Sequence, residues 1–324
     1  MNVLITGGLG FIGSNLFNFM KEKYPNYNLV ILDSMTYAAS DDNIDNPKSA
    51  KVIKFSITER ERLFNLFETY EFTHVIHLAA ESHVDNSIKN PLEFVNTNIV
   101  GTINLLDACV KYGIKLFYHI STDEVFGHLG ETGEFNEETP YDPRSPYSAS
   151  KASSDHFVRA YHHTYKLPVV ISNCSNNYGP NQHEEKLIPT IIKSIIKQTP
   201  IPIYGNGLNV RDWLYVGDHV DAIDNIFHNG TVGETYCIGG GVQMSNLKLT
   251  HIICDKLDEI LDYGANSREL ITFVEDRKGH DFRYAINNSK INKSLSWEPK
   301  TDFNEGIDIT INYYLNKFIK HLEL

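Results

Sequence analysis

A regular alternation of short strand-like runs with longer helical patterns fills the first half of the chain and constrains the fold more than any other feature. Runs rich in valine, isoleucine and leucine predict strands at residues 3–5, 29–32, 51–55, 74–78, 115–120 and 168–171. Amphipathic patterns between them predict helices over residues 11–23, 59–70, 91–112 and 146–166. Strands that alternate with helices form βαβ units, in which parallel strands lie between two helical layers. The sequence therefore predicts an α/β fold with a doubly wound parallel sheet.

The second half of the chain lacks this alternation. Prolines and glycines break it into short pieces after about residue 172, and they include the run Gly239–Gly241. Such punctuation is typical of a smaller, loop-rich unit that packs on the sheet. We therefore expect a first domain over residues 1–172 and a smaller C-terminal domain over residues 173–324, with segments of the second half returning to the first domain.

Charge and apolar content exclude several classes of protein. The chain has 29 Lys and Arg against 41 Asp and Glu, a net charge of -12, which repels nucleic-acid backbones. It is 41% hydrophobic, too apolar to stay disordered, yet no run approaches the ~20 apolar residues that a membrane helix needs. Four widely spaced cysteines and an N-terminus unlike a signal peptide indicate a cytoplasmic protein without disulfides. No cluster of histidines or cysteines has the spacing of a metal site.

Three glycines follow the first predicted strand at the start of the first helix: Gly7, Gly10 and Gly13. A tight strand-to-helix turn of this kind exposes backbone N–H groups and the positive end of a helix to a pyrophosphate. Asp33 ends the second strand, where a carboxylate accepts hydrogen bonds from a ribose 2′-OH and repels a 2′-phosphate. The pattern therefore indicates a Rossmann-type first domain that binds NAD rather than NADP.

A second constellation lies on the helix predicted over residues 146–166 and at the end of the strand before it. Tyr147 and Lys151 are four residues apart, so they share one helix face. A neighbouring ammonium and a positive nicotinamide ring would lower the pKa of Tyr147 from about 10 and make its phenolate a usable base. Ser121 and Thr122 place hydroxyl groups at the carboxyl end of the fifth strand, where ligands bind in open α/β sheets. We therefore expect a base and a hydroxyl group that together hold a substrate oxygen.

Longer motifs extend this pattern over about residues 1–290. They comprise residues 10–15 (GFIGSN), 77–85 (HLAAESHVD), 121–125 (STDEV), 145–152 (SPYSASKA), 173–180 (NCSNNYGP), 185–189 (EKLIP), 211–213 (RDW) and 279–281 (GHD). In this order they resemble the signatures of the nucleoside-diphosphate-glucose 4,6-dehydratases, within the extended short-chain dehydrogenase/reductase family. The resemblance implies a tightly retained NAD, a substrate-binding C-terminal domain, and a homodimer formed by two long helices of each subunit.

The resemblance implies conversion of dTDP-glucose or UDP-glucose to the 4-keto-6-deoxy sugar nucleotide. Tyr147, assisted by Lys151 and Thr122, would remove the C4 hydroxyl proton while C4 passes a hydride to NAD. The resulting 4-ketone would acidify the C5 proton, which Glu124 would remove while Asp123 protonates the departing C6 oxygen. The hydride would then return to C6. Two carboxyls in different environments can supply a base and an acid, and this pair distinguishes the dehydratases from related 4-epimerases.

The resemblance also implies two sets of contact residues. For NAD they are Gly7, Gly10, Phe11, Ile12, Gly13, Asp33, Ser34, Met35, Thr36, Ser56, Ile57, Leu78, Ala79, Ala80, Thr97, Tyr147, Lys151 and Asn177. For the nucleotide sugar they are Ser82, Thr122, Asn176, Lys186, Leu187, Pro202, Ile203, Tyr204, Arg211, Asn246, Arg277 and His280. The two arginines suit a diphosphate, because a guanidinium matches phosphate geometry and offsets the acidic charge of the protein.

The nucleotide base and two alternative functions stay open. Asn86 stands where bacterial dTDP-glucose enzymes usually have arginine. Thymine and uracil differ by one methyl group, worth only about 1–3 kcal/mol in an apolar pocket, so the base is not assigned. A nucleotide-sugar 4-epimerase is the alternative enzyme, and a catalytically silent dinucleotide sensor is the alternative outside enzymes. A silent fold has no need of the tyrosine, the lysine and both carboxyls, which argues against the sensor.

Overall fold

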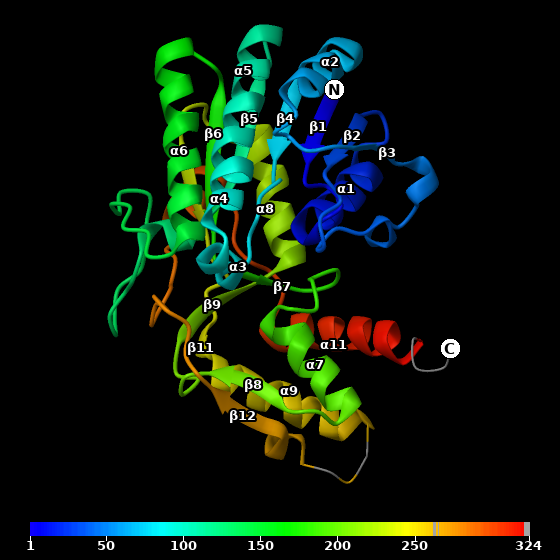
Figure 1. Cartoon of the computed structure of the whole chain (residues 1–324), viewed down its shortest axis with the longest axis vertical. Coiled ribbons are helices and arrows are strands. Elements are labelled where there is room, and N and C mark those ends of the chain that lie inside the picture. Colours follow the sequence, from blue (N-terminus) through cyan, green and yellow to red (C-terminus); the bar gives the residue numbers. More distant parts are fainter. Residues whose placement is uncertain (262–263, 265, 321–324) are drawn as a thin grey trace.

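The computed structural model of the chain describes residues 1–261, 264 and 266–320. Its larger sheet has seven strands: β1 (Asn2–Thr6), β2 (Asn28–Asp33), β3 (Lys51–Lys54), β4 (His74–His77), β5 (Leu116–Thr122), β6 (Val169–Cys174) and β10 (Thr235–Ile238). They lie in the order β10-β6-β5-β4-β1-β2-β3 (Figure 1). All neighbouring pairs are parallel. The chain winds outward from β1 in both directions, so the predicted doubly wound α/β fold is confirmed.

Helices cover both faces of this sheet, and alternate residues of each strand face opposite layers. One layer contains α1 (Phe11–Lys23), α8 (Val216–Asn229) and α10 (Ser289–Leu295), and the other contains α2 (Arg60–Tyr70), α5 (Thr102–Tyr112) and α6 (Pro146–Tyr165). Val3 and Ile5 of β1 pack in the core of the first layer, and Leu4 packs in the core of the second. Burial on both faces explains why the strands are nearly continuous apolar runs.

The helix predicted over residues 91–112 differs in its middle. It consists of α4 (Pro91–Phe94), a π-helical segment η3 (Val95–Gly101) and α5, and α3 (Val84–Lys89) precedes it. The wider turn of η3 brings Asn98 inward, where its side chain bonds both backbone groups of Glu81 at 2.8 and 3.0 Å. The sequence periodicity predicts the helix but not this local widening, because the apolar spacing on either side stays helical.

A smaller part lies below the sheet in Figure 1. It contains a three-stranded sheet of β7 (Asn176–Tyr178), β9 (Val210–Tyr215) and β11 (Gln243–Ser245), and a parallel pair of β8 (Ile201–Tyr204) and β12 (Ile271–Val274). Its helices are α7 (Leu187–Lys197), α9 (Asn246–Leu261) and α11 (Phe303–Lys320). These helices share a core with β8, centred on the apolar face of α7.

Short 3-10 segments complete the described structure. They are η1 (Asp41–Asn43), η2 (Pro47–Ser49), η4 (Asp123–Phe126) and η5 (Ser267–Leu270). Among the described helices, none combines the length and apolar character needed to span a bilayer.

Segments of the second half of the chain complete the larger sheet. β10 pairs with β6, and α8 packs on α1 through an ion pair of 2.7 Å between the Lys23 Nζ and an Asp224 carboxylate oxygen. The chain therefore leaves the sheet after β6, forms part of the smaller unit and returns. The exact domain boundary at residue 172 stays a prediction.

Candidate active site

Two adjoining cavities lie at the carboxyl ends of the parallel strands, beside the point between β1 and β4 where the strand order reverses. The larger one, of about 320 Å³, extends from the turn after β1 to the ends of β5 and β6. The smaller one, of about 180 Å³, lies between β9, the start of α7 and the segment around residues 277–284. Their linings share Ser82, Glu124, Asn176, Asn177, Gln182, Glu185 and Lys186. Open α/β sheets bind their ligands in this position.

Backbone shape forms one end of the larger cavity. Gly7 has a φ of 70°, and a Cβ there would lie 2.7 Å from the backbone nitrogen of Ala79. A Cβ on Gly13 would lie 2.2 Å from the carbonyl oxygen of Gly7. Gly10 differs: among the described residues, a Cβ there would meet only that carbonyl oxygen, at 3.4 Å, and Gly10 lines the cavity. The turn therefore keeps a cradle open at the N-terminus of α1, which suits a pyrophosphate.

Asp33 lies beside this cradle at the end of β2. One carboxylate oxygen accepts a hydrogen bond from the backbone N–H of Leu9 at 3.0 Å, and the other accepts one from Met35 at 2.9 Å. Burial raises the pKa of Asp33, while the two hydrogen bonds oppose the shift. The carboxyl lines the cavity and retains free lone pairs, so it can accept hydrogen bonds from a ribose diol.

The structure brings together almost the whole set of residues that the sequence assigns to the cofactor. All of them line the larger cavity except Met35. Met35 has a φ of 55°, and its side chain packs against the core on the α1 side of the sheet. Its contribution here is a backbone N–H that holds Asp33. The residues present therefore fit NAD: a glycine cradle for the phosphates and an acidic residue for the adenosine ribose.

Tyr147 and Lys151 lie on the first turns of α6, which begins with a capping box between Ser145 and Ser148. Both side chains line the larger cavity, and the Lys151 Nζ donates to the carbonyl oxygen of Ile120 at 2.9 Å. Burial raises the pKa of Tyr147 well above its usual value, and the Glu124 carboxylate raises it further. The protein groups alone therefore do not lower this pKa, because the phenol is buried beside a carboxylate. The expected lowering stays a prediction for the site with a nicotinamide ring bound.

The segment Thr122-Asp123-Glu124 turns sharply from β5 into η4, with the Thr122 Oγ1 accepting the N–H of Glu124 at 3.3 Å. All three residues line the larger cavity. Burial raises the pKa of Asp123 well above its usual value, and the nearby carboxylates of Glu124 and Asp212 raise it further. Burial also raises the pKa of Glu124, but Arg211, Lys186 and Arg277 oppose that shift. The two adjacent carboxyls therefore differ in their surroundings: carboxylates add to the rise in pKa at Asp123, and cations oppose it at Glu124.

Cations gather around the smaller cavity. Its lining contains these predicted substrate residues: Ser82, Asn176, Lys186, Leu187, Arg211, Asn246, Arg277 and His280. The Arg211 guanidinium is held by the backbone carbonyl oxygens of Val210 and Asp281 at 2.8 and 3.0 Å and lies over the Tyr284 ring. Arg277 lies 3.6 Å from an Asp85 carboxylate oxygen, and its Nε has no hydrogen-bond partner among the described residues. Three cations at one wall suit a diphosphate.

Three predicted substrate residues line neither cavity: Pro202, Ile203 and Tyr204. All belong to β8, where alternate side chains face the core, and Ile203 is buried against α7. Tyr204 lies near the rim, where its hydroxyl donates to an Asp85 carboxylate oxygen at 3.1 Å and Arg277 lies 4.7 Å from its ring centre. Strand β8 therefore lies beside the two cavities and lines neither of them.

Other lining residues were not predicted. In the larger cavity they include Glu81, Cys174, Gln182, His183 and Glu185, and in the smaller one His83, Trp213, Asp281 and Tyr284. The motifs quoted above were the available signal for five of these residues, which stand inside them: Glu81, His83, Cys174, Trp213 and Asp281. Glu185 also opens the motif over residues 185–189, whereas Gln182 and His183 lie outside every motif, and only the fold brings them to the cavity.

Comparison with known proteins agrees with this geometry. The sequence model of the family described as GDP-mannose 4,6 dehydratase matches residues 4–310. The dTDP-glucose 4,6-dehydratase of Salmonella typhimurium is 45% identical, with 97% of this chain and 93% of that protein covered. A dTDP-glucose 4,6-dehydratase of Streptomyces venezuelae, solved with NAD, is 39% identical with a TM-score of 0.91, covering 98% of this chain and 97% of the other.

The likeness extends to enzymes with a different reaction but is weaker in sequence. A UDP-glucose 4-epimerase of Thermotoga maritima gives a TM-score of 0.89 at only 28% identity, covering 98% of this chain and all of the other. The fold is therefore shared with epimerases, whereas the closer sequence agreement is with dehydratases. The family match over nearly the full length, together with the glycine cradle, the Tyr147–Lys151 pair and the adjacent carboxyls, shows that the chain belongs to the GDP-mannose 4,6 dehydratase family of extended short-chain dehydrogenase/reductases.

Proposed function

We propose that the protein is an NAD-dependent dehydratase that converts dTDP-glucose to its 4-keto-6-deoxy form. One observation carries the proposal: two adjacent carboxyls line the cavity beside Tyr147, one surrounded by other carboxylates and one facing three cations. Loss of water from a sugar needs an acid for the departing oxygen and a base for the carbon-bound proton. The unequal surroundings of Asp123 and Glu124 supply both.

NAD is the proposed cofactor, held by the glycine cradle, by Asp33 and by Lys151. Bound there, it accepts a hydride from C4 of the sugar and returns it to C6. The fit rests on the cradle that a side chain at Gly13 would fill and on the carboxyl at the end of β2. The relative from Streptomyces venezuelae was solved with NAD, which supports this choice.

The chain's own residues then divide the proton transfers. The Tyr147 phenolate takes the proton of the C4 hydroxyl, and Thr122, hydrogen-bonded to it, helps to hold that oxygen. Because the resulting C4 carbonyl makes the C5 proton acidic, Glu124, the more readily ionised carboxyl, can remove it. Asp123, kept protonated by burial and by its neighbours, donates to the C6 oxygen so that water leaves. The role of each carboxyl follows from which of the two holds a proton, and the order of the steps follows from the need for a C4 carbonyl before the C5 proton can leave.

The substrate diphosphate is proposed to lie in the smaller cavity against Lys186, Arg211 and Arg277. These cations would compensate the phosphate charge within an acidic protein. The base is proposed to be thymine because the relatives at 45% identity are dTDP-glucose enzymes. The site residues themselves do not distinguish thymine from uracil, so both nucleotides belong in the test.

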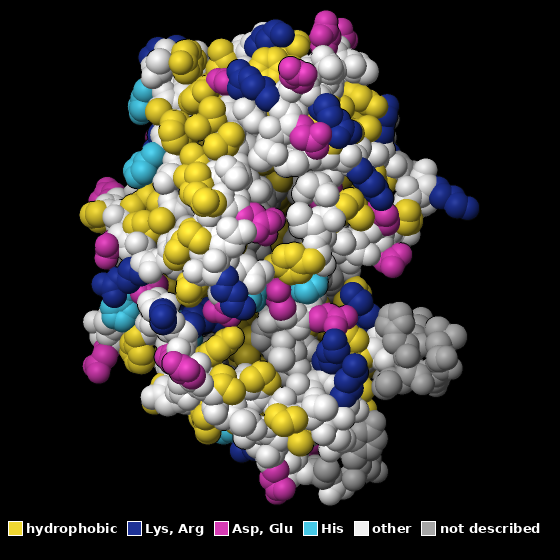
Figure 2. Space-filling view, in the orientation of Figure 1, with side chains coloured by type: hydrophobic (Ala, Val, Ile, Leu, Met, Phe, Trp, Pro, Cys, Tyr) yellow, Lys and Arg dark blue, Asp and Glu magenta, His cyan; other side chains and the backbone are white. Residues whose placement is uncertain are grey.

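A homodimer is also proposed, with the surface formed by α4, η3 and α6 as its interface. Exposed apolar side chains gather there on α4, η3 and α6: Leu92 (69% exposed), Val95, Val100 and Phe157. Figure 2 shows hydrophobic side chains over this side of the molecule. A second copy of the chain suits the patch, because clustered exposed apolar side chains mark protein–protein interfaces and most soluble oligomers are symmetric homodimers. Leu92→Glu should weaken the dimer in sedimentation, whereas Phe273→Glu, on an apolar residue of β12 that is 55% exposed, should not.

The cytoplasm is the proposed place of action. All four cysteines are free and buried in the described structure. Buried free thiols are compatible with a reducing compartment.

Turnover with dTDP-glucose and UDP-glucose side by side tests the function. A product lighter by one water supports dehydration, and a product of unchanged mass would instead favour the epimerase. Glu124→Gln should lower kcat about 10²- to 10⁴-fold, the usual contribution of a general base. Glu138→Gln, an exposed carboxyl in the loop that follows, is the matched control and should leave kcat unchanged. Full turnover by the Glu124 variant would refute its assigned role.

A further inference from the structure

A buried carboxylate lies under the catalytic face of α6, one helical turn after Lys151. Asp155 is fully buried and lines neither cavity. One of its oxygens lies 3.0 Å from the His119 Nε2. The other accepts hydrogen bonds from the Ser121 hydroxyl at 2.9 Å and the Tyr141 hydroxyl at 2.8 Å. So many donors around one carboxylate indicate that it is ionised inside the protein.

The groups that face Asp155 come from several elements. Lys151 and Arg159 lie one turn before and one turn after it on α6, and His119 projects from β5. Burial lowers the pKa of His119 to about 4, so its ring is neutral, and its Nε2 lies 3.0 Å from an Asp155 oxygen. Tyr141 donates to Asp155 and accepts from Arg159 at 2.8 Å. Since His119 is uncharged, the nearest positive charges to the carboxylate are on Lys151 and Arg159.

Lys151 needs a negative partner in this environment. It is only 5% exposed, and burial lowers the pKa of its ammonium, while Asp155 is the strongest group opposing that shift. Its Nζ donates to the Ile120 carbonyl oxygen, which is a dipole and not a charge. A buried ammonium without a counter-ion tends to lose its proton. Asp155 supplies the opposite charge on the same helix face.

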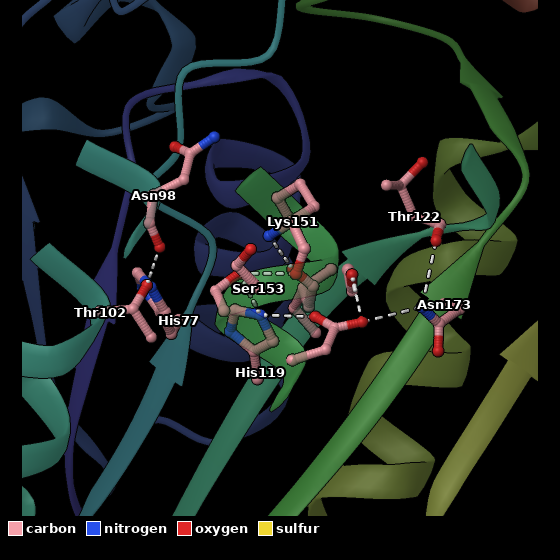
Figure 3. Close-up of polar contacts among 12 residues, drawn as sticks. His77, Asn98, Thr102, His119, Thr122, Lys151, Ser153 and Asn173 are labelled. Carbon is pink, nitrogen blue, oxygen red and sulfur yellow. Dashed lines mark hydrogen bonds and ion pairs between the residues drawn. The ribbon is translucent and has the colours of Figure 1, made fainter. Parts of the chain in front are cut away.

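Asp155 also connects α6 to the strand that carries the acid–base residues. The Asn173 side-chain amide lies 3.3 Å from an Asp155 oxygen and donates to the carbonyl oxygen of Thr122 at 3.0 Å. Ser121, which donates to Asp155, directly precedes Thr122 on β5. Figure 3 shows Lys151, His119, Asn173 and Thr122 around this network, with the contact between Asn173 and Thr122 as a dashed line. Asp155 therefore faces Lys151 on α6 and also contacts the residues that hold Thr122 at the end of β5.

We propose that Asp155 is a positioning residue that acts through Lys151 and Thr122, keeping the lysine charged and fixing the end of β5 against α6. The proposal deepens the proposed dehydratase function and depends on it. Asp155 does not contact substrate or cofactor; it sets the charge of one group that does and the position of another. Without its charge, Lys151 would lose its proton at a lower pH and could no longer stabilise the Tyr147 phenolate.

The dependence of kcat on pH tests this role in the full-length protein with NAD. Asp155→Asn keeps the size and part of the hydrogen bonding but removes the charge, so the alkaline limb of the kcat profile should move about one to two pH units lower. KM should stay within about twofold, because Asp155 lines neither cavity. Asp155→Glu keeps the charge on a longer side chain. It should leave the alkaline limb in its original position while kcat falls about tenfold through displacement of Thr122.

Asp224→Asn is the matched control. Asp224 is also a buried carboxylate with several donors, including Lys23 and Tyr24, but it lies on α8 and lines neither cavity. This variant should lower stability without moving the kcat profile. An Asp155→Asn profile that coincides with that of the original protein would overturn the proposal, as would a shift of equal size in the Asp224 variant.

The outcomes separate this proposal from the function itself. If the unmodified protein does not dehydrate the sugar nucleotide, the proposed function fails before any variant is compared. If it does, and only the alkaline limb of the Asp155→Asn profile moves, the positioning role is supported. Should Asp155→Asn fail to fold, Asp155→Glu decides: an unchanged alkaline limb with reduced kcat supports the role, and an unchanged kcat refutes it.

Discussion

The two cavities of the active site are built by different means. Backbone turns at the ends of parallel strands form the larger one, and the geometry of Gly7 and Gly13 leaves no room for a side chain. Long side chains from separate loops form the smaller one, with Arg211 from β9 and Arg277 from the segment after β12. A backbone-built wall cannot be altered without moving the fold. A wall of side chains can be altered by single substitutions that leave the backbone in place. The smaller cavity, proposed for the nucleotide sugar, is therefore where related enzymes can diverge.

The largest effect is expected where the backbone leaves no space. Gly13→Ala would place a Cβ 2.2 Å from the Gly7 carbonyl oxygen, a contact that requires the turn to move. We expect a loss of about 3 kcal/mol in the free energy of unfolding, the upper range for overpacking. Affinity for NAD should also fall beyond detection. Thermal unfolding and calorimetric titration with NAD measure the two effects.

Gly10→Ala is the matched control for that substitution. Its Cβ would meet one backbone oxygen at 3.4 Å and would otherwise occupy the cavity. Stability should therefore stay within about 0.5 kcal/mol of the original, the usual range for a tolerated surface change, while NAD affinity still falls. Equal loss of stability in both variants would show that the turn, and not the ligand, requires glycine at position 10.

The next largest effect is expected from acid, which should lower the free energy of unfolding through two buried histidines. Burial lowers the pKa of His119 to about 4 and that of His219 to about 3, so both are neutral in the folded protein. Their folded pKa values lie below the unfolded value of about 6.5. The stability that each neutral histidine contributes is therefore complete above about pH 6.5. It declines as the pH falls from the unfolded pKa to the folded pKa of that histidine.

The histidine contribution can be measured directly. His119 alone accounts for about 3 kcal/mol between pH 6.5 and pH 4, at 1.36 kcal/mol for each pKa unit. Urea unfolding at a series of pH values gives the slope. His119→Gln should flatten it, and the same change at the exposed His163 should not. An unchanged slope in the His119 variant would mean that this ring is not held neutral by burial.

A smaller and more selective effect is expected on the side-chain wall. Arg277→Gln removes one charge from the smaller cavity while the backbone stays in place. KM for the sugar nucleotide should rise about 10-fold, as for loss of a charged hydrogen bond of about 1.5 kcal/mol. NAD affinity and thermal stability should not change. A parallel loss of NAD affinity would show that the two cavities are not independently built.

The smallest effect is expected at the rim. Tyr204→Phe removes the hydrogen bond to Asp85 but keeps the ring beside Arg277. Because the pair is partly exposed, the change should cost less than about 1 kcal/mol and alter KM less than about threefold. A tenfold rise in KM with dTDP-glucose would instead place this tyrosine in direct contact with the nucleotide.

The same contrast explains what the sequence could predict. The cofactor side follows from local rules: a strand, a glycine turn, a helix and an acid after the next strand, all within residues 2–33. Periodicity and parallel pairing then place the ends of β5 and α6 at the same edge of the sheet, which brings Thr122 and Tyr147 together. These inferences need no knowledge of long loops, and the structure agrees with them.

Other features depend on tertiary contacts that no local pattern encodes. Packing of β8 on α7 determines which of its side chains face the core, so the sequence motifs could not predict that Ile203 is buried. The π-helical turn at Val95–Gly101 brings Asn98 to the backbone of Glu81, a contact that no local pattern indicates. The raised pKa of Tyr147 arises from its burial beside Glu124, which only the assembled site reveals. Spacing identifies the reacting groups, but their protonation depends on the completed fold.

The late position of α8 and β10 in the chain has a consequence for biosynthesis. The ion pair between Lys23 and Asp224 joins residues 201 positions apart, and β10 completes the sheet edge only after residue 235. While the ribosome is still adding the intervening segments, the α1 face of the emerging sheet lacks α8, which carries Val220 into that core, and the outer edge of β6 has no neighbour. Contacts this remote in sequence form slowly. Nascent chains of this protein should therefore expose an apolar surface longest on the α1 side, and that surface is where a holding chaperone would act first.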